Sequence, residues 1–179
     1  SIDYSDAEKI KLEGLNKMLA VREEDRSEIV DLSESLAITN GITINALCAL
    51  SGLELQEDCI KQAEASADFI RNHLWTTAGG FPPSMTLDEY AHGLDGLVSL
   101  LQKSWREVDI AFAKKIAEAL IEDFYDTEVG GFYMAPKTRE DLIFNPKPTM
   151  DETRGPGNAI ASSALNKLGL ILGESKFRD

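Results

Sequence analysis

The sequence of 179 residues holds only two cysteines and two histidines, and it contains no apolar run near the ~20 residues that a membrane span needs. Cys48 and Cys59 have neither the spacing of a metal site nor a neighbouring histidine to complete one, so we expect no metal. A buried thiol is the simplest role for Cys48, with a disulfide to Cys59 as the alternative. The sequence also lacks phosphate-binding glycine loops, nucleophile elbows and zinc motifs, and it therefore predicts no cofactor. Because no stretch resembles a signal peptide, the expected location is cytoplasmic.

Positive charge is scarce as well, with 18 Lys and Arg against 31 Asp and Glu and a net charge of −13. Such a field repels phosphate backbones and anionic lipid, so we expect neither nucleic acid nor a membrane as a partner. The length and the 43% share of hydrophobic residues are ordinary for one globular domain. We therefore expect a single domain over residues 1–179.

The clearest positive signal is self-similarity at an offset of about fifty residues. One apolar stripe occurs twice with the same intervals of three and four residues, which place each copy on one face of a helix. Its two copies are Ile60, Ala63, Ala67, Ile70, Leu74 and Ile110, Ala113, Ala117, Leu120, Phe124. The preceding apolar helices match at the same offset, and each striped helix is followed by Gly-Gly-Phe. Each unit therefore predicts an inner helix, a turn, an outer helix that the glycines stop, and a loop.

These patterns predict an all-α fold of repeated helical hairpins. The units are expected at about 40–81, 88–132 and 158–179, after a leading amphipathic helix at about 6–22. Two short strand-like runs lie between the second and third units and predict a small β-hairpin near residues 131–145.

Several sequence blocks occur in an order that resembles one known family. They are Asp88-Glu89-Tyr90-Ala91, Gly130-Gly131-Phe132-Tyr133, Pro146-Lys147, Asp151 and Gly157-Asn158. They are similar to the helical part of the thioredoxin-domain-containing, spermatogenesis-associated-type family, a part that itself resembles N-acylglucosamine and cellobiose 2-epimerases and six-hairpin glycosidases. The resemblance extends from about Arg22 to Leu172 and implies an α/α toroid, in which inner and outer helices alternate around a central cavity.

The sequence also departs from that family. Before the first inner helix the family carries an acidic pair, a lysine and Ser-Trp-Asn-Gly, of which only Asn40 and Gly41 remain. No thioredoxin-like part is present, and the hairpins are too few for a complete ring. We therefore expect an arc of the toroid.

The resemblance implies that the loops before the inner helices meet at one mouth of the cavity. Asp88, Glu89, Tyr90 and His92 open the second inner helix and could bind sugar hydroxyls or move a proton. Alternatively, Asp88 or Glu89 caps the helix and Tyr90 packs in the core. A glycosidase needs two facing carboxylates, and Asp88 or Glu89 with Asp151 is the pair that we nominate.

Other polar residues near the expected mouth have weaker claims. Asn40 and Asn158 are expected as N-caps of the first and third inner helices, with ligand contact as a second role. Arg154, like Asp151 and Lys147, could form a local ion pair or touch a polyol.

Histidine chemistry is disfavoured. Epimerases of this fold use paired histidines, whereas this sequence offers only His92 and, on an outer helix, His73. We expect His92 to be a buried structural residue.

Two functions follow. The first is a non-catalytic or degenerate module that self-associates as a homodimer or binds a missing toroid or thioredoxin-like part. The second is a carbohydrate-binding or carbohydrate-active domain that takes a small sugar. A sugar site should bring Asp88, Tyr90 and Asn158 to one pocket, whereas an interaction module should bond them internally and expose an apolar patch at the edge of the arc.

Overall fold

In the computed structural model, residues 33–51, 56–82, 84–139, 141–148 and 155–178 are described, and they are mostly helical. The helices are α2 (Ser33–Leu50), α3 (Gln56–Phe69), α4 (Leu87–Leu101), α5 (Glu107–Ala119) and α6 (Gly157–Leu172). Short turns of π-helix, η2 (Ile70–Leu74) and η3 (Leu120–Phe124), continue α3 and α5, and a 3-10 turn, η4 (Ser175–Phe177), follows α6. The described residues contain no strand, which confirms the all-helical prediction. The expected leading helix at 6–22 lies outside the described residues.

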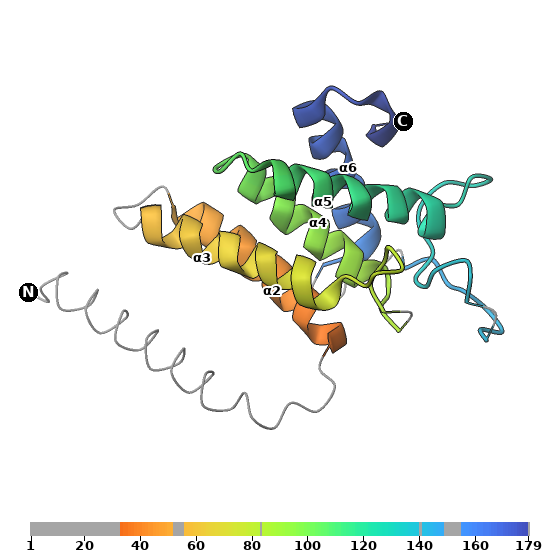
Figure 1. The fold of residues 1–179 in the computed structure, drawn as a ribbon. Helices are drawn as coiled ribbons and strands as arrows, with labels where there is room; N and C mark the ends of the chain where they lie inside the picture. Colours follow the sequence, from red (N-terminus) through yellow and green to blue (C-terminus); the bar gives the residue numbers. More distant parts are fainter. Residues whose placement is uncertain (1–32, 52–55, 83, 140, 149–154, 179) are drawn as a thin grey trace, which may run out of the picture. The chain divides into compact units, whose positions relative to one another are not determined.

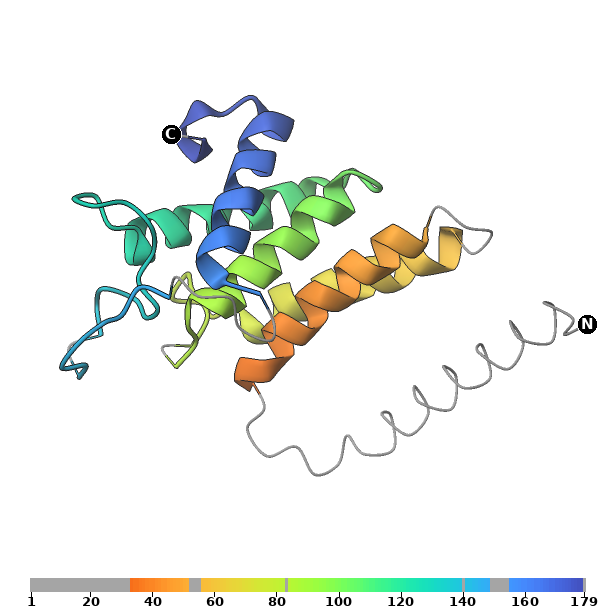
Figure 2. The same cartoon turned by 180° about the vertical axis from the view of Figure 1, so that it is seen from behind.

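The helices form two layers, with α2, α4 and α6 in one layer and α3 and α5 in the other (Figures 1 and 2). Asp95 of α4 lies between its two neighbours: it accepts a hydrogen bond from Asn45 of α2 at 2.8 Å and one from Lys167 of α6 at 3.2 Å. Towards the helix starts, Gly41 meets the backbone of His92 and Gly157 meets Asp88. In each pair of neighbouring helices, the contact nearer the start of one helix is also nearer the start of the other. The helices α2, α4 and α6 therefore run parallel.

The crossing of α2 and α4 depends on two glycines. A Cβ atom on Gly41 would overlap the carbonyl oxygen of His92, and one on Gly96 would lie 2.8 Å from the carbonyl oxygen of Gly41. The two backbones therefore touch directly, which is a physical reason for Gly41 to be present in this sequence.

The fifty-residue repeat is confirmed in three dimensions. In both copies of the stripe the last four residues are buried and the first is partly buried. Both outer helices also end in the same unusual way, since the N–H groups of Trp75 and Tyr125 donate to the carbonyls of Ile70 and Leu120, five residues earlier, at 3.1 and 3.2 Å. The two hairpins thus share a backbone detail that the apolar pattern did not predict.

The outer helices α3 and α5 are joined by an ion cluster. The Asp109 side chain is fully buried and accepts hydrogen bonds from Arg106 at 2.6 and 2.9 Å and from Arg71 at 3.1 Å. Both guanidinium groups also reach Asp68, at 2.5 Å for Arg71 and 3.0 Å for Arg106. Because each charge faces opposite charges, the cluster fixes the packing of the two helices without leaving a buried ion unpaired.

Two local predictions need correction. Asn40 is not an N-cap, because it lies inside α2 and donates to the carbonyl of Leu36. The Gly-Gly pairs do not stop the outer helices, which end earlier, at Leu74 and Phe124; the left-handed Gly79 and Gly130 instead turn the loops that follow.

The expected β-hairpin near 131–145 is not confirmed, since the described residues there pair only in an isolated bridge between Phe132 and Tyr125. The arrangement as a toroid arc and the extent of a single domain stay predictions. No helix within the described ranges combines the length and apolar character required to traverse a bilayer.

Candidate functional site

The start of α4 is closed by a capping box. The Glu89 carboxylate accepts hydrogen bonds from the backbone N–H and the hydroxyl of Thr86, both at 2.7 Å. Burial raises the pKa of the Glu89 carboxyl. The expected capping alternative therefore describes Glu89, whose carboxylate is engaged in holding the helix end.

Tyr90 is only 3% exposed, and its hydroxyl accepts a hydrogen bond from the backbone N–H of Phe81 at 2.9 Å. Its ring packs against Phe81, Trp75 and Phe124 with centroid distances of 4.7, 6.2 and 4.9 Å. Tyr90 therefore links the first Gly-Gly-Phe loop to the core. Burial raises the pKa of its hydroxyl, so the side chain stays neutral at physiological pH.

Asn158 links the second Gly-Gly-Phe loop, at residues 130–132, to α6 by hydrogen bonds. Its Oδ1 accepts the N–H of Phe132 at 2.7 Å, and its Nδ2 donates to the carbonyls of Phe132 at 2.9 Å and of Pro148 at 3.0 Å. The N-cap of α6 is Pro156, so the predicted capping role of Asn158 is wrong. Its amide pairs with Phe132 as a neighbouring strand would.

A second asparagine, Asn145, forms the same kind of pair with Ala135, three residues after Phe132. Asn145 accepts the N–H of Ala135 at 3.0 Å and donates to its carbonyl at 2.8 Å. Between these pairs, the carbonyl of Met134 accepts the N–H of Leu87, the first residue of α4, at 2.8 Å. Segment 132–135 is thus bonded to Leu87 at the start of α4 and to Asn158 at the start of α6, the region where the family resemblance implied the mouth of a cavity.

Lys147 has a local role in this segment. It forms an ion pair with Asp126, donates to the carbonyl of Gly130 at 3.0 Å and lies over the Tyr133 ring, 4.9 Å from its centroid. Hydrogen bonds from Lys147 and from the backbone N–H of Glu128 lower the pKa of Asp126.

The structure places only some of the remaining candidates. Asp88 is half-buried with its carboxylate against Gly157, and His92 is buried in α4. Asp151 and Arg154 lie outside the described residues, so the nominated carboxylate pair stays a prediction. Within the described ranges, no three His, Cys, Asp or Glu side chains come together as a metal site.

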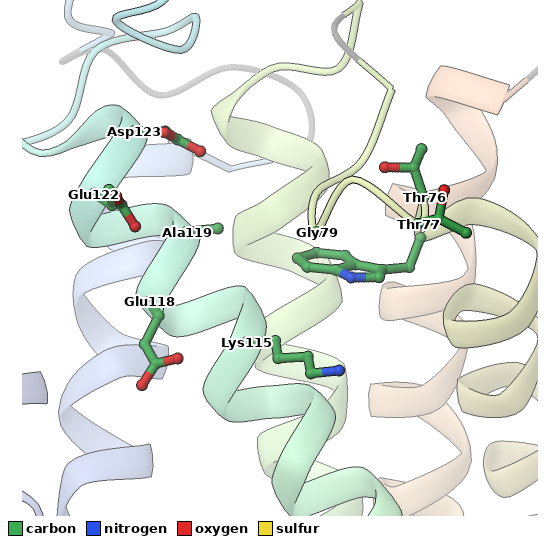
Figure 3. A pocket seen from close by; sticks show the side chains of 9 residues that line it. Thr76, Thr77, Gly79, Lys115, Glu118, Ala119, Glu122 and Asp123 are labelled. Carbon is green, nitrogen blue, oxygen red and sulfur yellow. The ribbon is translucent and has the colours of Figure 1, made fainter.

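The structure does contain an open hollow of about 410 Å³ that sequence reasoning missed (Figure 3). It lies between the loop after α3 and the last turns of α5, and it is lined by Trp75, Thr76, Thr77, Gly79, Lys115, Glu118, Ala119, Glu122 and Asp123. Burial and the neighbouring Glu122 raise the pKa of Asp123. None of the candidate residues lines this hollow.

An exposed apolar patch is what we expected of an interaction module, and α2 carries an exposed apolar strip, which we call the open face. It consists of Ile42, Ala46, Ala49 and Leu50, with Ile42 43% and Leu50 49% exposed. Their spacing puts all four on one side of the helix, and none is charged. The repeat aligns Leu50 with Leu100 of α4 and marks both positions as apolar, but only the structure shows that Leu50 is exposed while Leu100 is fully buried.

The described residues are therefore mostly helical and contain repeated hairpins, with Glu89, Tyr90 and Asn158 engaged in internal hydrogen bonds and an exposed apolar strip on α2. Its sequence is distantly similar to spermatogenesis-associated protein 20, with 21% identity to the Rattus norvegicus and Mus musculus proteins and 22% to the Homo sapiens protein over 185 residues. These alignments cover 93% of this chain but only 23% of each relative, so the chain spans less than a quarter of their length. No protein-family model matches the chain. The expected relationship to 2-epimerases and glycosidases stays a prediction.

Proposed function

We propose that this chain is a non-catalytic module of an α/α-hairpin array, an arc of a toroid, that binds a protein partner through the open face of α2. The observation that carries this proposal is the open face itself. The strip consists of two large and two small apolar residues, none of them charged, and it is exposed to water. Covering such a surface with a partner lowers the free energy.

The polar candidates support the same conclusion. Glu89, Tyr90 and Asn158 use their side chains to hold Thr86, Phe81 and Phe132. Binding a sugar through these atoms would require breaking hydrogen bonds within the fold. This adds a free energy cost that a site with unengaged polar groups would not have. A function that leaves these bonds intact fits the geometry better than carbohydrate chemistry at the mouth.

The test compares two leucines that occupy equivalent positions in the repeat. At protein concentrations low enough to prevent association, Leu50→Lys should change the free energy of unfolding by less than about 1 kcal/mol, because a half-exposed residue loses little. Leu100→Lys should prevent folding, because it buries a charge in the core. An equally damaging Leu50→Lys would mean that the open face belongs to the core, and the proposal would fail.

A thermal-shift screen tests the carbohydrate alternative. Monosaccharides, disaccharides and amino sugars at millimolar concentration should leave the melting temperature unchanged. A ligand that binds the folded state must raise it by mass action, so a reproducible rise with one sugar would count against a non-catalytic module.

A further inference from the structure

The repeat indicates what kind of element covers the open face. Moving fifty residues along the chain takes Ile42, Ala46 and Leu50 to His92, Gly96 and Leu100 of α4. These counterparts are buried, and the backbone at His92 and Gly96 touches Gly41 of α2. The open face of α2 therefore corresponds to the surface by which α4 meets α2, the inner helix before it.

The opposite edge of the array has a different character. The exposed positions of α6 are Ala159, Ser162, Ser163, Asn166, Lys167 and Leu170, so four of the six are polar and Leu170 is 61% exposed. A polar outer surface is typical of the closing repeat of an array, whereas an apolar one marks an edge where another repeat stacks. Among the described residues, the strip on α2, whose four members are all apolar, therefore fits an edge where another repeat stacks better than the exposed side of α6 does.

We propose, on the basis of the proposed function, that the partner is a further inner helix of the same hairpin class, which packs parallel to α2 across Ala46. Its contact surface resembles the one that α2 presents to α4, with glycine at the crossing and aliphatic side chains one turn on either side. Ala46 is the counterpart of Gly96 and is small enough to allow a close approach of the two helices. The relatives are more than four times as long as the region that they share with this chain, so those proteins have room for such a helix.

The contact surface of α2 itself provides the probe. We would use a fluorescent peptide with the sequence of residues 33–51, in which Cys48→Ala prevents oxidation and a hydrocarbon bridge joins positions 42 and 46. The bridge stabilises the helix and removes the peptide's own copy of the open face, while Gly41 and Ile44 stay available. Binding to the full chain is measured by fluorescence anisotropy.

The peptide should bind saturably, and Ala46→Glu in the chain should weaken binding about tenfold or more, as expected for a charge at the centre of an interface. Asn166→Glu, a matched change at an exposed position of α6, should have no effect. A peptide with Gly41→Leu should bind about tenfold more weakly, because the bulky side chain prevents close approach. Absence of saturable binding, or equal binding of the Gly41→Leu peptide, would overturn the inference.

A second copy of the chain is the competing occupant, and analytical ultracentrifugation of the chain alone detects it. A dimer that Ala46→Glu dissociates, together with no peptide binding, would assign the open face to self-association; the proposed function would then stand while this inference fails. The Leu50→Lys measurement of unfolding tests the proposed function separately, so the two failures are distinguishable.

Discussion

The side-chain amide of Asn158 pairs with both backbone polar groups of Phe132, at 2.7 Å and 2.9 Å, although the residues are 26 positions apart in the sequence. One side chain thereby replaces a β-strand partner and satisfies an N–H and a carbonyl that would otherwise need another backbone. The pair also connects the second Gly-Gly-Phe loop to the start of α6, as Tyr90 connects the first loop to α4.

Removing this amide should loosen the loop more than the helix. Asn158→Ala leaves the Phe132 N–H and carbonyl without their partner, so the free energy of unfolding should fall by about 1–3 kcal/mol. Urea denaturation measures the loss, and hydrogen exchange should show faster exchange at the Phe132 amide. Asn166→Ala, at an exposed position of the same helix, is the control; equal losses in the two variants would contradict the assigned role.

The glycines at the crossing of α2 and α4 predict that Gly→Ala, which usually stabilises a helix, destabilises this protein. Gly→Ala inside a helix usually stabilises a protein by about 0.5–1 kcal/mol, because alanine restricts the unfolded chain. At Gly41 and Gly96 the new methyl group would meet backbone atoms, so each substitution should instead destabilise by about 1–3 kcal/mol.

Gly93 supplies the control for that comparison. A Cβ there would lie 3.8 Å from the Phe81 ring, an ordinary contact, so Gly93→Ala should be neutral or stabilising. Thermal unfolding of the three variants decides the matter, and a stabilising Gly41→Ala would show that the helices do not touch as described.

The buried carboxylate of Asp109 should matter more than an exposed one. Asp109→Ala leaves Arg71 and Arg106 close together without the carboxylate between them, and the free energy of unfolding should fall by about 3 kcal/mol. Asp141→Ala breaks an exposed pair with Arg139 and should change little, because solvent screens such pairs. Similar effects of the two changes in urea denaturation would mean that the ion cluster does not hold α3 against α5.

Lowering the pH should destabilise the folded chain in part through protonation of Asp126. Because the pKa of this carboxyl is lowered in the folded chain, its contribution is fully present above the unfolded value of about 3.9 and is lost as the pH falls below it. Between pH 5 and pH 2 the wild-type chain should therefore lose more stability than Asp126→Asn does. Lys147→Met should reduce that difference, since the Lys147 ammonium is the main cause of the lowered pKa. Parallel stability curves for wild type and Asp126→Asn would refute this account.

The sequence predicted the helical elements because their apolar stripes carry the information locally. Ala63, Ala67 and Leu120 are buried as the intervals of three and four residues require. The roles of the polar residues were harder to predict, because they depend on partners distant in the chain. Asn158 was expected to cap a helix by a rule about its immediate neighbours, whereas its actual partner is Phe132.

The same limit applies to the charges. Nothing in the sequence around Arg71 indicated its partner Asp109, which lies 38 positions away. The open face was visible in principle, since Leu50 aligns with Leu100, but a repeat pattern does not say which copy stands at an edge. Local periodicity therefore predicted the elements, and only the tertiary packing could assign the polar groups.

The π-helical turns at Ile70–Leu74 and Leu120–Phe124 determine where this chain tolerates a change of length. Each turn holds one residue more than an α-helical turn would, and deleting that residue would rotate everything after it by about 100° around the helix axis. Phe81 would then face away from Tyr90, and Phe132 away from Asn158. An insertion at the exposed stretch Thr127–Val129 would not rotate either helix, and it would instead disturb the turn in which the Glu128 N–H donates to Asp126.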